Sequence, residues 1–410
     1  MFCISNKRVI LLPSVGIFNR HSFDVETRLK AMKFNVNSLK FIDLFSGCGG
    51  FSHGLEMAGH RCLLGVDFNA DAIESFKHNH PHAKTFLGDI KTLKSSQLQK
   101  MLNGQKVDMV VGGPPCQGFS TVGKGEAHDE RNQLFKEFVR VVKQLEPKVV
   151  LFENVTGLVA KKNEKILKNI FTLFEKLGYS MDAMILNSEE FGVPEKRRRT
   201  IIMGVKGGEG LFPSPTHGES RKKLVTVAEV FKNLKNKRGE IFNHDVSLAE
   251  IKKIEDRERL KFIPPGCGIR YKNDEKKYLP KKLWYDVDWS KLKENRFRQT
   301  RLQRLPLDQP SPTILTARTS YYHPRENRYL TPREAAACQS FPNDFKFFGS
   351  QTSVFRQIGN AVPPLMAKSI GESLKKIDFN LKKTKKKNLP KLISKQAFFY
   401  KKSSPNARTH

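Results

Sequence analysis

The sequence lacks several features that would assign it to a broad class of proteins. No apolar run reaches the roughly 18 residues that a membrane-spanning helix needs. The six cysteines are widely spaced, with no C-x-x-C pair and no Cys/His cluster, which argues against a disulfide framework and a metal site. The apolar stretch after Lys7 and Arg8 is short and broken by Pro13, so it makes a poor signal peptide. We therefore expect a cytoplasmic protein with no membrane contact and no metal.

Acidic residues are scarce beside basic ones. The chain has 41 Asp and Glu against 73 Lys and Arg, which gives a formal net charge of +32 and an isoelectric point near 9.9. Such an excess favours a polyanionic partner, of which nucleic acid is the commonest. A lysine-rich, solvated surface is the alternative. The length of 410 residues allows one large domain and a smaller one.

Short apolar runs alternate with amphipathic segments between residues 38 and 204. KFIDLFSG, CLLGVD, VDMVVGG, KVVLFENV and TIIMGV are typical of buried strands. Apolar residues at helical spacing, from Leu134 to Leu145 and from Ile166 to Leu177, predict two of the helices between them. This alternation predicts an α/β fold with a doubly wound, mostly parallel sheet. Ligands of such sheets bind at the carboxyl ends of the strands, where FSGCGG, GGPPCQG and ENV lie.

Composition divides the rest of the chain. We interpret residues 1–37 as an N-terminal extension, with Met32 as a natural start, and 38–204 as the catalytic and cofactor-binding domain. The lysine-rich, irregular stretch 205–330 is predicted to be a smaller inserted domain. Residues 331–378 return to the first domain through a helix capped by Thr331 and Glu334. The basic tail 379–410 contains no acids, and we expect it to be disordered.

The glycine-rich turn FSGCGG follows the first predicted strand. Glycines there let a ligand approach the backbone, and the next helix offers free N–H groups. The second strand ends in Asp67, well placed to hold ribose hydroxyls, and Asp89 follows the third apolar segment. The chain has no G-x-x-x-x-G-K-[ST] phosphate-binding loop. A nucleoside site without a phosphate grip fits S-adenosylmethionine better than ATP.

The stretch GGPPCQGFS places Cys116 directly after two prolines and beside glycines. The prolines fix the backbone, and the glycines permit a sharp exit from the strand, which holds the thiol away from packing. We interpret Cys116 as a nucleophile that acts as a thiolate. An incidental buried cysteine is the alternative. We assign no role to Cys3, Cys62, Cys267 or Cys338.

Two further motifs supply an acid and two guanidiniums. Glu153 follows four apolar residues at a strand end, and a carboxyl in such surroundings has a raised pKa. Its alternative role is to cap the next helix. Arg197 and Arg199 alternate just before a strand, so both face one side and suit a pyrimidine carbonyl and a phosphate.

These motifs, in this order, resemble those of the cytosine-C5 DNA methyltransferases, of the stand-alone restriction-modification type. The matching segments are DLFSGCGGF, GGPPCQGFS, ENV, GVPEKRRR, RLPLDQPSPTILT and RYLTPREAAACQSFPNDF with RQIGNAVPP. The resemblance covers residues 40 to about 375, apart from the 205–300 insert. It implies the methyltransferase fold, with 205–330 as a target-recognition domain that reads the DNA sequence.

The resemblance also implies roles residue by residue. Cys116 would add to C6 of a flipped-out cytosine, Glu153 would hydrogen-bond N3 and the exocyclic amine, Arg199 would contact the base and Arg197 would support the site. Gln117, Ser120 and Arg131 would contact DNA. S-adenosylmethionine, without a metal, would be held by these residues: Phe45, Gly47, Cys48, Gly49, Gly50, Asp67, Phe68, Asp89, Ile90, Pro114, Asn360 and Val362.

One residue departs from the family pattern, which usually has Gln where this chain has Glu195. We expect this carboxylate to pair with Arg197 and tune the site without abolishing activity. The alternatives are a tRNA methyltransferase, which a missing C-F-T signature disfavours, and a binding protein that has lost activity. We expect the protein to act as a monomer on double-stranded DNA. A cognate restriction endonuclease would share its recognition sequence. In a bacterium we expect the protein to be associated with the nucleoid. In a eukaryote we expect it in the nucleus, with KKTKKK as the nuclear localisation signal.

Overall fold

The computed structural model describes residues 38–114 and 130–379, with the side chains of 130–132 left out. The predicted extension 1–37, the tail from 380 onward, and Cys116, Gln117 and Ser120 lie outside the described residues, as does the side chain of Arg131.

A seven-stranded sheet forms the centre of the first region, in the order β3-β2-β1-β4-β5-β8-β6. All its strands run parallel except β8, which lies antiparallel between β5 and β6. The predicted α/β fold with a doubly wound, mostly parallel sheet is confirmed. The strands are β1 (Lys40–Leu44), β2 (Arg61–Asp67), β3 (Lys84–Leu87), β4 (Met109–Gly112), β5 (Val149–Val155), β6 (Tyr179–Asn187) and β8 (Arg198–Lys206).

Helices cover both faces of this sheet, because successive side chains of a buried strand point to opposite sides. Ile42 and Leu44 belong to the core that includes α4, α5 and α6, whereas Phe41 belongs to the core that includes α2, α3 and α12. The helical periodicity predicted α5 and α6 correctly. The helices are α2 (Gly50–Met57), α3 (Ala70–Asn79), α4 (Ser95–Leu102), α5 (Glu130–Leu145) and α6 (Glu164–Lys176).

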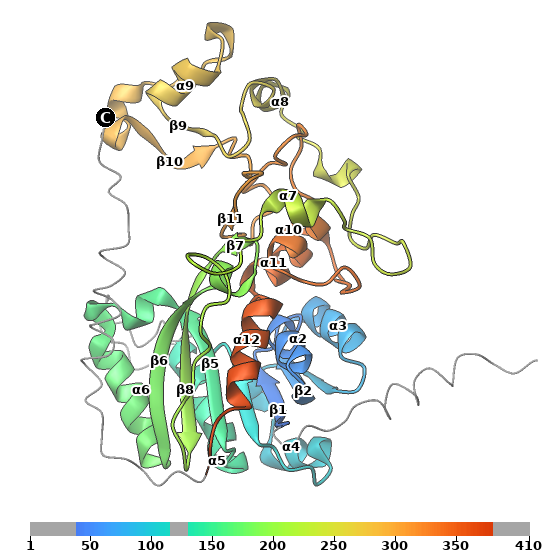
Figure 1. The fold of residues 1–410 in the computed structure, drawn as a ribbon, viewed down its shortest axis with the longest axis vertical. Helices are drawn as coiled ribbons and strands as arrows, with labels where there is room; N and C mark the ends of the chain where they lie inside the picture. Colours follow the sequence, from blue (N-terminus) through green and yellow to red (C-terminus); the bar gives the residue numbers. More distant parts are fainter. Residues whose placement is uncertain (1–37, 115–129, 380–410) are drawn as a thin grey trace, which may run out of the picture. The chain divides into compact units, whose positions relative to one another are not determined.

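The strand order reverses at β1, which pairs with β2 on one side and β4 on the other. In doubly wound sheets the crevice at this switch point is where ligands bind. The motifs FSGCGG and ENV follow β1 and end β5, and Gly112–Pro114, the described start of GGPPCQG, follows or ends β4, so the fold gathers these residues at the carboxyl ends of three neighbouring strands (Figure 1).

The segment from 207 to 330 is built from short elements. Its hydrophobic core includes Trp289, Phe297 and Tyr322, all of which are buried. A second core joins Val227, Leu305 and Ile314 to the helices that follow residue 331. The elements are α7 (Val227–Phe231), α8 (Ile254–Leu260), β9 (Ile269–Tyr271), α9 (Lys272–Tyr278), β10 (Arg296–Arg301) and β11 (Ser311–Pro312), which pairs with β7 (Glu195–Lys196).

Three helices close the described chain: α10 (Pro332–Cys338), α11 (Gln351–Asn360) and α12 (Pro364–Leu374). The Thr331 hydroxyl accepts from the Glu334 backbone N–H and the Glu334 carboxylate accepts from the Thr331 N–H, which is the predicted capping box. Helix α12 packs beside α2 (Figure 1). None of the described helices is long and apolar enough to cross a membrane.

Candidate active site

A cavity of about 780 Å³ opens at the carboxyl ends of β1, β2 and β5 and reaches the end of α11. It brings together thirteen of the residues singled out from the sequence. These are Phe45, Gly47, Cys48, Gly50, Asp67, Phe68, Asp89, Ile90, Asn360 and Val362 from the cofactor set, and Glu153, Arg197 and Arg199 from the catalytic set.

The turn after β1 owes its shape to left-handed backbone at Phe45 (φ 62°), Gly47 (φ 54°) and Gly49 (φ 93°). Open space surrounds the position of a Cβ on Gly47, so the backbone there is bare toward the cavity. Ser46 lines the same wall, and its buried hydroxyl has no hydrogen-bond partner in the described part of the chain. The turn therefore offers a ligand both bare backbone and an unused polar group.

Asp67 ends β2 and fixes this turn from the side. Its carboxylate accepts the backbone N–H of Gly47 at 2.8 Å and that of Asn69 at 2.9 Å. Burial raises the pKa of Asp67, against the effect of these hydrogen bonds. The next residue, Phe68, lines the cavity with 75% of its surface exposed, which is unusual for so large an apolar side chain. An exposed aromatic face beside a carboxylate suits a nucleoside.

Asp89 lies on the same wall, where it caps the short helix that starts at Ile90. Its carboxylate accepts from the Lys91 backbone N–H at 2.9 Å and pairs with the Lys91 ammonium at 3.2 Å. Ile90 is buried beneath it. The acid is thus held in place and open to the cavity on its other side.

Glu153 and Arg199 meet across two antiparallel strands. Val155 on β5 pairs with Arg199 on β8, so Glu153 is the diagonal neighbour of Arg199 on the same face. Arg199 Nε lies 2.6 Å from Glu153 Oε1. Burial raises the pKa of Glu153 and outweighs the opposing pull of Arg199 and Arg197, which bears out the expectation for this carboxyl. Glu153 faces the arginine and the cavity, and does not cap a helix.

Arg197 is almost fully enclosed, at 1% exposure, between Glu195 and the end of α11. Its Nη2 donates to the Gly359 carbonyl at 2.8 Å, whereas its Nε and Nη1 have no hydrogen-bond partner among the described residues. The expected pairing with Glu195 is present as a loose ion pair, with Nη1 3.7 Å from Oε1. Glu195 itself accepts from the Ile314 N–H at 2.6 Å, and burial raises its pKa to about 7.

Two cofactor residues predicted from the sequence do not line the cavity. A Cβ on Gly49 would lie 2.4 Å from His80 Nε2, so this glycine is required by a side chain packed beneath the turn. Pro114 accepts a hydrogen bond at 3.2 Å from the Asn154 side chain, which ties the loop after β4 to the end of β5. Both support residues of the cavity wall.

Sequence reasoning missed several residues of the cavity. Asp43, buried within β1, accepts from the Ser52 hydroxyl at 2.6 Å, and burial raises its pKa to about 7. Arg356 and Gln357 line the cavity from α11. The motif RQIGNAVPP contained the signal for the last two, since both precede Asn360 by less than two helical turns, but nothing in an apolar strand marked Asp43.

The described cysteines contrast with the surroundings expected of a nucleophile. Cys48, Cys62 and Cys338 are buried, and burial raises the pKa of the Cys48 thiol to about 12. Cys267 accepts a hydrogen bond from the Tyr278 hydroxyl. The described residues contain no group of three or more His, Cys, Asp or Glu side chains placed to hold a metal ion.

Comparisons with known proteins agree with this geometry. The model of the C-5 cytosine-specific DNA methylase family matches residues 39–376. The Type II methyltransferase M1.HphI of Haemophilus parahaemolyticus is 39% identical over 347 residues, 84% of this chain and 88% of that protein. M.NgoFVII of Neisseria gonorrhoeae, also a Type II methyltransferase, is 35% identical over 387 residues, 88% of this chain and 95% of that protein.

A solved structure agrees as well. A crystal structure described as a DNA modification methyltransferase encoded within an E. coli prophage has a TM-score of 0.61 and 26% identity, and covers 82% of this chain and 98% of its own. The family match extends over most of the chain and includes every strand that builds the cavity. The chain therefore belongs to the C-5 cytosine-specific DNA methylase family and is a DNA (cytosine-5-)-methyltransferase.

Proposed function

We propose that this enzyme methylates cytosine at C5 within one short sequence of duplex DNA, through a covalent bond between Cys116 and C6 of a flipped-out base. The observation that carries the proposal is the cavity itself. A nucleoside-type wall and the cluster of Glu153, Arg197 and Arg199 face one continuous space. A target atom inside a duplex cannot reach such a recess, so the base must leave the stack.

The cavity wall fits S-adenosylmethionine as the methyl donor. The bare backbone at Gly47, the unpartnered Ser46 hydroxyl and the exposed Phe68 ring accommodate a nucleoside without a triphosphate. Asp67 and Asp89 would hold its polar groups, and Asn360 and Val362 close the opposite wall. S-adenosylmethionine supplies the methyl group that is transferred to C5. We propose that no metal takes part.

Glu153 prepares the base for attack. In its protonated form the carboxyl donates a hydrogen bond to cytosine N3 and accepts one from the exocyclic amine, and burial, which raises the pKa of Glu153, favours that form. That interaction withdraws electrons from C6. Arg199, fixed to Glu153 at 2.6 Å, keeps the carboxyl aimed into the cavity and contacts the base carbonyl.

Cys116 forms the covalent bond. The thiolate adds to C6, which makes C5 nucleophilic; after C5 is methylated, its proton is lost and the bond between sulfur and C6 breaks, which restores the thiolate. Cys116 lies two residues after Pro114 in the sequence, and the Pro114 carbonyl accepts a hydrogen bond from the side chain of Asn154, the neighbour of Glu153.

The DNA itself would be held by Gln117, Ser120 and Arg131 and by residues of the 205–330 region. The net charge of +32 supports a salt-dependent, sequence-blind share of this affinity. We propose that the protein acts as a monomer. Because its relatives are Type II methyltransferases, we also propose that it protects DNA from an endonuclease of the same recognition sequence.

The test is methyl transfer followed by bisulfite sequencing. Purified protein is incubated with labelled S-adenosylmethionine and either mixed-sequence duplex DNA or tRNA. We expect methylated cytosines in one short context of the duplex, and none with Cys116→Ser. Cys267→Ser is the matched control and should keep activity. Cys267 belongs to none of the motifs assigned to catalysis, and its thiol accepts a hydrogen bond from the Tyr278 hydroxyl. Label in tRNA alone, or full activity in Cys116→Ser, would overturn the proposal.

A further inference from the structure

The strand β10 contains a bulge that the active site does not use. It pairs with β9 at only two positions, Arg296 with Tyr271 and Arg301 with Ile269. Between those positions β10 holds the four residues 297–300, whereas β9 holds only Arg270. The extra residues leave the ladder, and such bulges re-aim side chains. We call residues 297–300 the β10 bulge.

The base of the β10 bulge is packed tightly. Phe297 is buried, with its ring 4.7 Å from Trp289 and 5.3 Å from Tyr285. The Arg301 guanidinium lies over the Phe297 ring at 4.4 Å. A Cβ on Gly268, the residue before β9, would lie 2.6 Å from the Thr300 side chain, so any larger residue at Gly268 would collide with the bulge.

The tip of the β10 bulge is free. Arg298 and Gln299 are exposed, and in the part of the chain that the structure describes neither has a hydrogen-bond or ion-pair partner. Their neighbour Arg296, by contrast, pairs with Glu294 at 3.1 Å. Side chains without partners add little to the stability of the fold. Their hydrogen-bonding groups are therefore available to bind a ligand.

The space beside the tip shows what kind of ligand fits. Residues 298–302 line a hollow of about 550 Å³, together with Thr319 and Ser320. The hollow also contains Asp256 and three tyrosine rings, so it is not a purely cationic surface for phosphate. Guanidinium and amide groups are planar, and each can make two parallel hydrogen bonds to a base edge.

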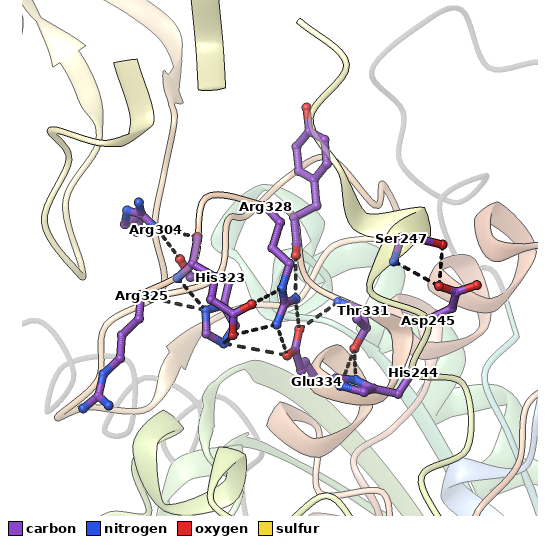
Figure 2. A network of polar contacts seen from close by, with 11 residues as sticks. His244, Asp245, Ser247, Arg304, His323, Arg325, Arg328, Thr331 and Glu334 are labelled. Atoms are coloured by element: carbon purple, nitrogen blue, oxygen red, sulfur yellow. Dashed lines mark hydrogen bonds and ion pairs between the residues drawn. The ribbon is translucent and has the colours of Figure 1, made fainter. Parts of the chain in front are cut away.

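The backbone around the hollow is also fixed. Arg304, three residues beyond β10, donates to the carbonyls of Leu260, Ile263, His323 and Glu326. Figure 2 shows the adjoining network, in which Arg328 makes two hydrogen bonds to Glu334, at 2.7 and 2.8 Å. The backbone that carries Arg298 and Gln299 would therefore be preorganised in the absence of DNA.

We propose that Arg298 and Gln299 read base edges in the major groove, Arg298 at a guanine and Gln299 at an adenine, and so set the sequence that is methylated. Arg pairs with guanine O6 and N7, and Gln pairs with adenine N6 and N7. The inference rests on the proposed function for its link to methylation, but sequence-selective binding tests it independently.

The experiment selects duplexes from a random-sequence library by binding, and separately maps methylation by bisulfite sequencing. Arg298→Lys keeps the charge and loses the two-pronged donor, so it separates base reading from phosphate contact. We expect it to lose preference for guanine at one position, by roughly tenfold or more, and Gln299→Ala to lose preference at a neighbouring adenine. Lys272→Ala, an exposed charge on α9 outside the hollow, keeps the full motif.

The outcomes distinguish failure of the proposed function from failure of the base-reading assignment. A wild-type motif in the binding selection without methylation would reject the proposed function and leave this inference standing. No selected motif for the wild type, or an unchanged motif in both Arg298→Lys and Gln299→Ala with unchanged thermal unfolding, would overturn it. Equal weakening on every sequence in Arg298→Lys, with an unchanged motif, would show that Arg298 contributes affinity without reading a base, which also overturns it.

Discussion

The sheet region and the 207–330 region are held together by different interactions. In β1, β4 and β5, apolar side chains such as Phe41, Val110 and Phe152 are completely enclosed between two layers of helices. In the 207–330 region the longest described strand has six residues, and a buried arginine, Arg304, joins separate loops through their carbonyls. The first arrangement depends on apolar periodicity along the chain, whereas the second combines a small hydrophobic core with a long buried side chain that joins loops.

We expect the largest loss of stability from replacing Arg304, the residue that joins the loops of the 207–330 region. Arg304→Met would leave four loop carbonyls without their donor, and we expect it to lower the free energy of unfolding by about 3–5 kcal/mol. Hydrogen exchange should quicken in 250–330 before it changes in β1 or β4.

Arg325→Met is the matched control, because Arg325 is exposed and its side chain points away from the network in Figure 2. It should change the free energy of unfolding by no more than about 0.5 kcal/mol. Uniform exchange across the whole protein in Arg304→Met would show that the two regions unfold together.

The next effect separates chemistry from recognition. Glu153→Gln keeps the shape of the side chain and removes the acidic proton, so kcat should fall by roughly 10²–10³-fold. The sequence motif obtained by binding selection should stay the same, because that motif is set elsewhere. A changed motif with unchanged kcat would contradict this division of labour.

A smaller effect tests the glycine turn. Gly49→Ala places a Cβ 2.4 Å from His80 Nε2 and strains a backbone at φ 93°. We expect about 2 kcal/mol of destabilisation and a raised KM for S-adenosylmethionine. Gly178→Ala has a similar φ of 89° with open space around it, so it measures the backbone strain alone. Equal KM values in the two variants would mean that the contact with His80 is not needed for binding the methyl donor.

The smallest effect on activity concerns Glu195. Its pKa is raised from 4.5 to about 7 in the fold, so the folded protein binds a proton that the unfolded chain releases first, and this contribution to stability is lost as the pH rises toward 7. Glu195→Gln should keep activity within about tenfold of the wild type. Relative to the wild type, its free energy of unfolding should rise between about pH 5 and pH 8. A constant difference across that range would show that Glu195 does not titrate there.

Sequence patterns predicted five strands of the sheet, β1, β2, β4, β5 and β8, because each of these is an apolar run. They predicted Glu153 and Arg199 as separate residues, but their contact depends on β8 entering the sheet antiparallel, which no local pattern reveals. The alternating β6 was missed because its half-buried side chains mix with polar ones. His80 beneath Gly49 and the β10 bulge were also missed, because both arise from contacts between distant parts of the chain.

The antiparallel pairing of β5 with β8 has a consequence for how this protein tolerates insertions. The register of this ladder sets the distance between the two side chains, because Glu153 and Arg199 are in contact only while Val155 stays opposite Arg199. One residue inserted within β8 would turn the guanidinium to the other face, and two would displace it by about 7 Å. Added length between 207 and 330 leaves that ladder untouched. The fold therefore allows variation in length in the region proposed to choose the DNA sequence, while the spacing of the reacting groups stays constant.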